Sequence, residues 1–338
     1  MAGSRQNEFI SIVMPVYREA AHIGEVLKDV ATALGEAGVR FELVLIDDGS
    51  PDDTWRALTE LSKAFPMMRA ARLSRNFGKE HALCAGLEMA RGDAVIVMDA
   101  DGQHPPSLLP KLISTWRETG VDIVEATKIN RGEETLFSKV AAGMFYWLWN
   151  KLSGFEMRGA SDYKLLNRTA VDAYLEMDER NVFFRGMTAW LGFSRAQVPF
   201  EVATRAGGST SWSIMHRVRL ALTGISGFSS LPLQFVTFTG LLFLLFSVIF
   251  GIYTLILQFA GHAATGFSTV ILLLLVIGSL LMISLGIIGI YLARIYDEIK
   301  GRPRYFIAKM IEPKESAASA NRKNDIREQP LFDMDAGV

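Results

Sequence analysis

The strongest constraint on this sequence is a long stretch without charge in its C-terminal third. Between Arg219 and Arg294 the chain contains no Asp, Glu, Lys or Arg. Two apolar segments within it, residues 233–258 and 268–292, are each long enough to cross a hydrocarbon layer of about 30 Å as a helix. A buried hairpin in a soluble protein is the alternative interpretation. The pattern favours a two-helix membrane anchor, which we place at residues 231–295.

The charges around this stretch predict how it lies in a membrane. Basic residues precede and follow it, whereas the loop between the two segments, residues 259–267, is short and uncharged. Because positive residues stay on the cytosolic side, we expect both ends of the chain and the large N-terminal part in the cytosol. The residues before Phe9 are polar, so no cleavable signal peptide is expected. The sequence therefore predicts a multi-pass protein of the inner (plasma) membrane, and glycines in its spans permit a homo-oligomer.

Upstream of the anchor, short apolar runs alternate with segments of helical periodicity. Four runs rich in apolar residues are expected to form buried strands: 9–16, 41–46, 68–73 and 95–98. Helices are expected between and after them, at about 21–35, 55–64, 80–90 and 108–118. Later strands are expected at 122–127 and 198–204. This alternation predicts an α/β fold, Rossmann-like, with a mainly parallel sheet.

Several classes of protein do not fit this sequence. It has no Gly-x-Gly-x-x-Gly loop and no Gly-Lys-Ser/Thr loop, which argues against a dehydrogenase and a P-loop NTPase. Its formal net charge of −1 provides no basic excess, so nucleic acid is not expected as a partner. The single cysteine, Cys84, excludes an internal disulfide, and its apolar helical surroundings predict that it packs in the core.

Acidic residues follow three of the predicted strands. Glu19 comes after the first, Asp47 and Asp48 after the second, and Asp99 and Asp101 after the fourth. The carboxyl ends of parallel strands meet at one edge of a sheet, where ligands bind in such folds. Two carboxylates one residue apart repel each other unless a cation lies beside them, and their hard oxygens suit Mg²⁺ or Mn²⁺ carrying phosphate groups. The alternative interpretation is an acidic turn in which Asp caps the next helix.

The motifs of the chain, taken in order, resemble those of a known enzyme family. Residues 12–19 (Ile-Val-Met-Pro-Val-Tyr-Arg-Glu), 47–50 (Asp-Asp-Gly-Ser) and 99–106 (Asp-Ala-Asp-Gly-Gln-His-Pro-Pro) together resemble the inverting family 2 glycosyltransferases, which have a GT-A fold. Residues 73–80 (Leu-Ser-Arg-Asn-Phe-Gly-Lys-Glu) and the end of the second span, residues 289–298, look like those of the polyprenyl-phosphate glycosyltransferases. That group includes bactoprenol glucosyltransferases and dolichyl-phosphate mannose synthases.

The resemblance implies roles for individual residues. The nucleotide would be bound by Pro15, Tyr17, Glu19, Asp48, Asp99 and Lys128. The divalent ion, Mg²⁺ or Mn²⁺, would be held by Asp99, Asp101 and Gln103. The catalytic residues would be Asp101, Asp162 and Arg205, and two roles are open for Asp162 near the acceptor, as a base or as a positioning group. Further candidates for binding phosphate are Arg131 and Arg185.

The resemblance also implies an order of domains. Residues 1–205 would form the cytosolic GT-A catalytic domain, and residues 206–230 an amphipathic juxtamembrane segment before the anchor. Residues 296–338 would form a cytosolic tail, which we expect to be mobile beyond about residue 312. Within the catalytic domain, residues 136–152 are apolar and aromatic with lysines near both ends. They are expected to form an interfacial helix, with a buried core helix as the alternative.

The function implied by the resemblance is the inverting transfer of one sugar to a lipid phosphate. The donor would be a nucleotide sugar, with UDP-glucose favoured, and the acceptor undecaprenyl phosphate at the cytosolic membrane face. A processive polysaccharide synthase is one alternative, but the sequence lacks the Gln-x-x-Arg-Trp motif of an acceptor site. Another is a membrane scaffold that binds a nucleotide sugar without turnover, against which the intact pair Asp99 and Asp101 argues.

Overall fold

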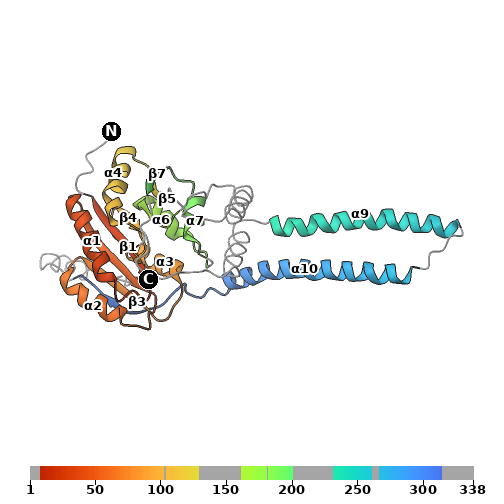
Figure 1. Ribbon diagram of the computed structural model, residues 1–338, viewed down its shortest axis with the longest axis horizontal. Coiled ribbons are helices and arrows are strands. Elements are labelled where there is room, and N and C mark those ends of the chain that lie inside the picture. Colours follow the sequence, from red (N-terminus) through yellow and green to blue (C-terminus); the bar gives the residue numbers. More distant parts are fainter. Residues whose placement is uncertain are drawn as a thin grey trace, which may run out of the picture.

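The computed structural model describes residues 8–102, 104–128, 161–180, 182–200, 231–260 and 266–313. In this part of the chain, one eight-stranded sheet has the order β7-β5-β6-β4-β1-β2-β3-β8 and carries helices on both faces (Figure 1). The strands are β1 (Phe9–Val16), β2 (Arg40–Asp47), β3 (Met68–Leu73), β4 (Ala94–Val97), β5 (Ile123–Lys128), β6 (Lys164–Asn167), β7 (Arg195–Phe200) and β8 (Ile307–Ile311). The helices are α1 (Ile23–Glu36), α2 (Thr54–Ala64), α3 (Lys79–Met89), the 3-10 turn η1 (Pro106–Leu108), α4 (Leu109–Thr119), α6 (Arg168–Glu176), α7 (Phe184–Trp190), α9 (Leu231–Phe259) and α10 (Phe267–Ile299).

The centre of the sheet is parallel, as the sequence predicts. β4, β1, β2 and β3 lie side by side in the same direction, and β7 runs parallel to β5. Alternate residues of β1 contribute to two cores, because Ile12 packs with α1 and α4 while Val13 packs with α3 on the opposite face. Helices on both faces explain why these strands are mainly apolar on both of their sides, with a few buried polar residues such as Ser11 and Glu42. Cys84 of α3 is buried in the second core, as expected.

Two antiparallel strands were not predicted. β6 lies between β4 and β5 and is antiparallel to both, and β8 is antiparallel to β3 at the edge of the sheet. β6 is only four residues long and begins with Lys164, which hides its apolar character in the sequence. β8 follows the second apolar helix, in a region that the sequence analysis assigned to the tail. The sheet is therefore mixed, although its centre is parallel.

Two long apolar helices project away from the sheet, side by side (Figure 1). Both α9 and α10 are long and apolar enough to cross a membrane, judged by length and composition, over Leu233–Thr254 and Leu273–Ile299. Their large apolar side chains are exposed, as for Leu241 and Leu285. α10 continues to Ile299, seven residues past the predicted end of the second span at Leu292.

The chain beyond α10 returns to the sheet and is held there. Arg304 donates hydrogen bonds to the carbonyls of Glu179 (3.0 Å) and Met177. The backbone N–H of Arg180 donates to Glu298, near the end of α10, at 2.8 Å. β8 then pairs with β3. These contacts fix the end of α10 against the α/β domain.

Several sequence expectations concern residues outside the described part of the chain. These are the interfacial helix at 136–152, the juxtamembrane segment at 206–230, the tail beyond residue 313, and the site residues Gln103, Arg131 and Arg205.

Candidate functional site

The carboxyl ends of β4, β1 and β2 lie next to one another, so the predicted acidic residues meet at one edge of the sheet. The register pairs Val16 at the end of β1 with Asp47 at the end of β2, and Val13 with Val97 at the end of β4. Asp47 caps a turn, because its Oδ1 accepts the Ser50 N–H at 2.9 Å, and it also lies 3.3 Å from Arg72. Asp47 therefore stabilises the turn after β2 and does not cap α2, which begins at Thr54.

Asp48 holds the loop between β3 and α3. Its two carboxylate oxygens accept the backbone N–H groups of Phe77 (2.7 Å) and Gly78 (2.9 Å). Burial of Asp48 raises the pKa of its carboxyl, and the two loop amides oppose this shift. The predicted role of Asp48 at the nucleotide stays a prediction, while the contacts show that it positions the residues immediately before Lys79.

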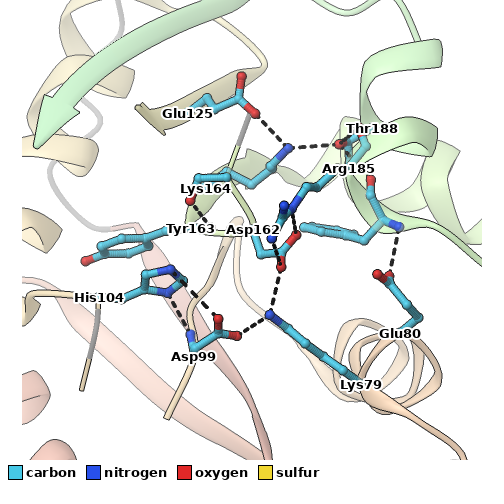
Figure 2. Close-up of polar contacts among 12 residues, drawn as sticks. Lys79, Glu80, Asp99, His104, Glu125, Asp162, Tyr163, Lys164, Arg185 and Thr188 are labelled. Carbon is cyan, nitrogen blue, oxygen red and sulfur yellow. Dashed lines mark hydrogen bonds and ion pairs between the residues drawn. The ribbon is translucent and has the colours of Figure 1, made fainter. Parts of the chain in front are cut away.

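Lys79, the first residue of α3, bridges two carboxylates, Asp99 after β4 and Asp162 before β6 (Figure 2). Its Nζ lies 2.5 Å from Asp99 Oδ1 and 2.7 Å from Asp162 Oδ2. Burial alone would lower the pKa of the lysine, but the two carboxylates outweigh burial and raise it. Lys79 is therefore a cation beside the predicted metal-binding carboxylates, a role that its place in the motif at residues 73–80 did not predict.

Asp162 contacts two cations of the site, Arg185 and Lys79. It is buried and receives Arg185 in a bidentate contact, with Nε at 2.6 Å from Oδ1 and the terminal nitrogen at 2.8 Å from Oδ2. Burial opposes ionisation, yet Arg185 and Lys79 hold the pKa of Asp162 well below its usual range. A carboxylate held by two cations has little affinity for a proton, so these contacts favour the positioning alternative, and the role of Asp162 stays a prediction.

The predicted metal ligands begin directly after β4. The N–H of Asp99 donates to His104 Nδ1 at 2.8 Å, and the His104 ring stacks on Tyr163 with centroids 4.7 Å apart. Gly102 has a positive φ of 75°, which turns the chain tightly between Asp101 and His104. Among the described residues, no group of three or more His, Cys, Asp or Glu side chains could hold a metal ion. A pair of carboxylates completed by substrate phosphates is nevertheless how Mg²⁺ is usually bound at nucleotide sites.

Behind these residues, buried polar contacts fix α7, which carries Arg185. Lys164 Nζ lies 2.9 Å from Glu125 Oε1 and donates to Thr188 of α7 at 3.0 Å. Glu80 accepts the N–H of Phe184, at the start of α7, at 2.8 Å. Lys79, Glu80 and His104 belong to the motifs at residues 73–80 and 99–106, but no role was predicted for any of them from the sequence.

The remaining predicted residues have less informative surroundings. Pro15 lies in β1, opposite Ile46 of β2. Tyr17 is partly exposed, with the Arg18 guanidinium over its ring. The Glu19 N–H donates to Thr54 at 3.1 Å. Lys128 is the last residue of β5, two strands away from β4.

The mixed α/β sheet, with its carboxylates and cations gathered at the strand ends, is that of a GT-A glycosyltransferase. The chain belongs to glycosyl transferase family 2, whose model matches residues 11–177. The family expected from the sequence motifs is thereby confirmed.

Relatives match nearly the whole chain. It is 35% identical over 303 residues to the bactoprenol glucosyl transferase of Shigella phage SfII, with 89% of this chain and 97% of the relative covered. It is 35% identical over 320 residues to the putative glycosyltransferase CsbB of Bacillus subtilis, with 94% and 97% covered. Among solved structures it is similar to glucosyl-3-phosphoglycerate synthase from Mycobacterium tuberculosis, with 21% identity, a TM-score of 0.45, and 65% of this chain and 76% of that chain covered.

Proposed function

We propose that this protein transfers one glucose from UDP-glucose to undecaprenyl phosphate, with inversion at the anomeric carbon. The observation that carries the proposal is its similarity, at 35% identity and over 89% of its length, to a bactoprenol glucosyl transferase. The relative's name supplies both the sugar and the lipid. The strand-end site provides the carboxylates and cations that a nucleotide sugar and a lipid phosphate require.

The oxygen ligands at the end of β4 fit a divalent ion, either Mg²⁺ or Mn²⁺. Asp99 and Asp101 offer hard carboxylate oxygens one residue apart, and Gln103 would add an amide oxygen. When bound, the ion would neutralise charge on the diphosphate of the donor. Lys79 and Arg185 would add fixed positive charge on the side where Asp162 lies.

The acceptor explains why a catalytic domain carries two apolar helices. A long polyprenyl chain keeps its phosphate at the membrane surface, so the enzyme must work there. We place α9 and α10 across the inner membrane with the domain and both termini in the cytosol, as the flanking basic residues favour. The hydrogen bond from the Arg180 N–H to Glu298 would then help to hold the domain close to that surface.

Release of the nucleotide tests the proposal directly. The full-length protein, purified in detergent with Mn²⁺ or Mg²⁺, is incubated with a panel of UDP-sugars and GDP-sugars, with and without undecaprenyl phosphate. UDP release from UDP-glucose that depends on the lipid, with one sugar on the lipid product, supports the proposal. Products with long sugar chains would instead indicate a polysaccharide synthase. Binding of UDP-glucose without any release would indicate a non-catalytic scaffold, and release from another donor only would correct the sugar.

A further inference from the structure

The position of Lys79 has a consequence for how the metal ion and the donor bind. Its ammonium contacts Asp99, a proposed metal ligand, at 2.5 Å and Asp162 at 2.7 Å (Figure 2). A lysine at that distance competes with a divalent ion for the same carboxylate. We propose that Lys79 is the resident counter-ion of the metal site, which gives up Asp99 when the metal arrives together with the nucleotide diphosphate. This inference rests on the proposed function.

The lysine is placed there by its surroundings. Asp48 holds the amides of Phe77 and Gly78, so α3 begins at the strand ends with Lys79 as its first residue. At the start of the same loop, the Ser74 N–H donates to the carbonyl of Phe306 at 2.8 Å. A cation in the first turn of a helix is disfavoured by the helix dipole. The carboxylates of Asp99 and Asp162 therefore provide the compensation that keeps the lysine in place.

The charges of the cluster predict that the metal ion and the donor bind cooperatively. The cations Lys79 and Arg185 contact the carboxylates Asp99 and Asp162 directly, so they already neutralise part of the negative charge that would attract a metal ion. A divalent ion alone would add positive charge next to the lysine and would have to compete with it for Asp99. A metal ion that arrives with a doubly negative diphosphate brings its own neutralising charge. Metal and donor should therefore bind together, with each strengthening the binding of the other.

After the exchange, Lys79 retains a partner. Asp162 also contacts Arg185, and it remains available to the lysine through Oδ2. The lysine side chain is partly exposed, so its ammonium is able to face an incoming phosphate without leaving Asp162. Lys79 is thus a positioning residue that sets the charge of the metal site before and after the donor binds.

The test measures Mn²⁺ binding at equilibrium, with and without UDP, by the electron paramagnetic resonance signal of free Mn²⁺. Wild type should bind Mn²⁺ weakly alone and much more tightly with UDP. Lys79→Met should bind Mn²⁺ alone at least about tenfold more tightly than wild type, which corresponds to about 1.4 kcal/mol. It should also show a smaller effect of UDP and slower glucosyl transfer. Lys79→Arg, which keeps the charge, should behave like wild type in Mn²⁺ binding.

The controls separate this inference from a structural effect and from the proposed function. Lys63→Met removes an exposed lysine that pairs with Glu60 and should change neither measurement. A structural role alone would make Lys79→Met bind Mn²⁺ more weakly, because a damaged site binds less, and that result overturns the inference. Unchanged Mn²⁺ affinity in Lys79→Met overturns it too; if that variant fails to fold, Lys79→Gln takes its place. A wild type that binds Mn²⁺ with UDP but transfers no sugar would refute the proposed function alone.

Discussion

The guanidinium of Arg69, buried in β3, donates two hydrogen bonds to Glu312, at 3.2 and 2.7 Å. Glu312 comes directly after β8, the strand that brings the chain from α10 back to the sheet. Arg69 also donates to the carbonyl of Met89, at the end of α3, at 2.7 Å. One buried side chain therefore joins the C-terminal segment to the helix that begins with Lys79.

Glu312→Ala should destabilise the catalytic domain by about 1 to 2 kcal/mol, because it leaves the buried Arg69 without its main acceptor. The thermal midpoint of the detergent-purified protein measures the effect. Glu60→Ala is the control, since Glu60 forms an exposed pair with Lys63 at 2.7 Å and such pairs contribute about 1 kcal/mol or less. Equal midpoints for the two variants would contradict a structural role for the Arg69 contact.

The pair Lys164–Glu125 should show strong coupling in a double-mutant cycle. Both side chains are buried and their charged atoms are 2.9 Å apart. Lys164→Met alone should cost about 3 to 5 kcal/mol of unfolding free energy, because it leaves a buried carboxylate unpaired. The double variant with Glu125→Met should recover much of that loss, since two apolar side chains need no partner. Denaturant unfolding provides the measurement, and additive losses would contradict the prediction.

Local pattern predicted the parallel half of the fold. β1 and β3 have the predicted bounds, because each is a run rich in apolar residues between turn residues, although β3 also contains Arg69 and Arg72. β6 escaped prediction because its buried Lys164 looks like a surface residue until Glu125, from another strand, is seen to pair with it. β8 escaped because it is stabilised by pairing with β3, which is remote in the sequence. Both misses depend on contacts that no local window contains.

The candidate site was predicted in the same uneven way. Carboxylates after parallel strands must lie at one edge of the sheet, so Asp48, Asp99 and Asp101 could be found from order alone. Arg185 was a candidate for binding phosphate, but its pairing with Asp162 could not be predicted. The direction of Lys79 could not be predicted either, since it depends on the loop that Asp48 holds. Arg185 reaches Asp162 only because α7 is fixed by contacts at both of its ends.

Glu80 should make stability depend on pH. Burial raises the pKa of this carboxyl to about 7, and the nearby Asp162 adds to the shift. A raised pKa in the folded state means that the protonated form stabilises the fold, so this contribution is full below the unfolded pKa near 4.5 and is lost as pH rises through about 7. Glu80→Gln keeps an acceptor for Phe184 and carries no charge.

From pH 5 to pH 8, the free energy of unfolding of Glu80→Gln should therefore rise relative to that of wild type by about 2 to 3 kcal/mol. This follows from about 1.4 kcal/mol per unit of pKa shift. Unfolding measured at both pH values on both proteins gives this difference. A wild type and variant that respond identically to pH would show that Glu80 ionises normally in the folded protein.

Asp101→Ala should reduce glucosyl transfer by at least about a hundredfold while leaving the fold intact. Its carboxylate is a proposed metal ligand, and removal of an electrostatic group at a reacting charge commonly costs that much in turnover. A chelator should abolish wild-type transfer and added Mn²⁺ should restore it, whereas no amount of Mn²⁺ should restore the variant fully.

Asp53→Ala removes an exposed carboxylate that pairs with Arg56 and should transfer sugar at the wild-type rate. Because α9 and α10 lie far along the chain from Asp101, both variants should fractionate with membranes as wild type does. Wild-type turnover by Asp101→Ala would remove Asp101 from the metal site.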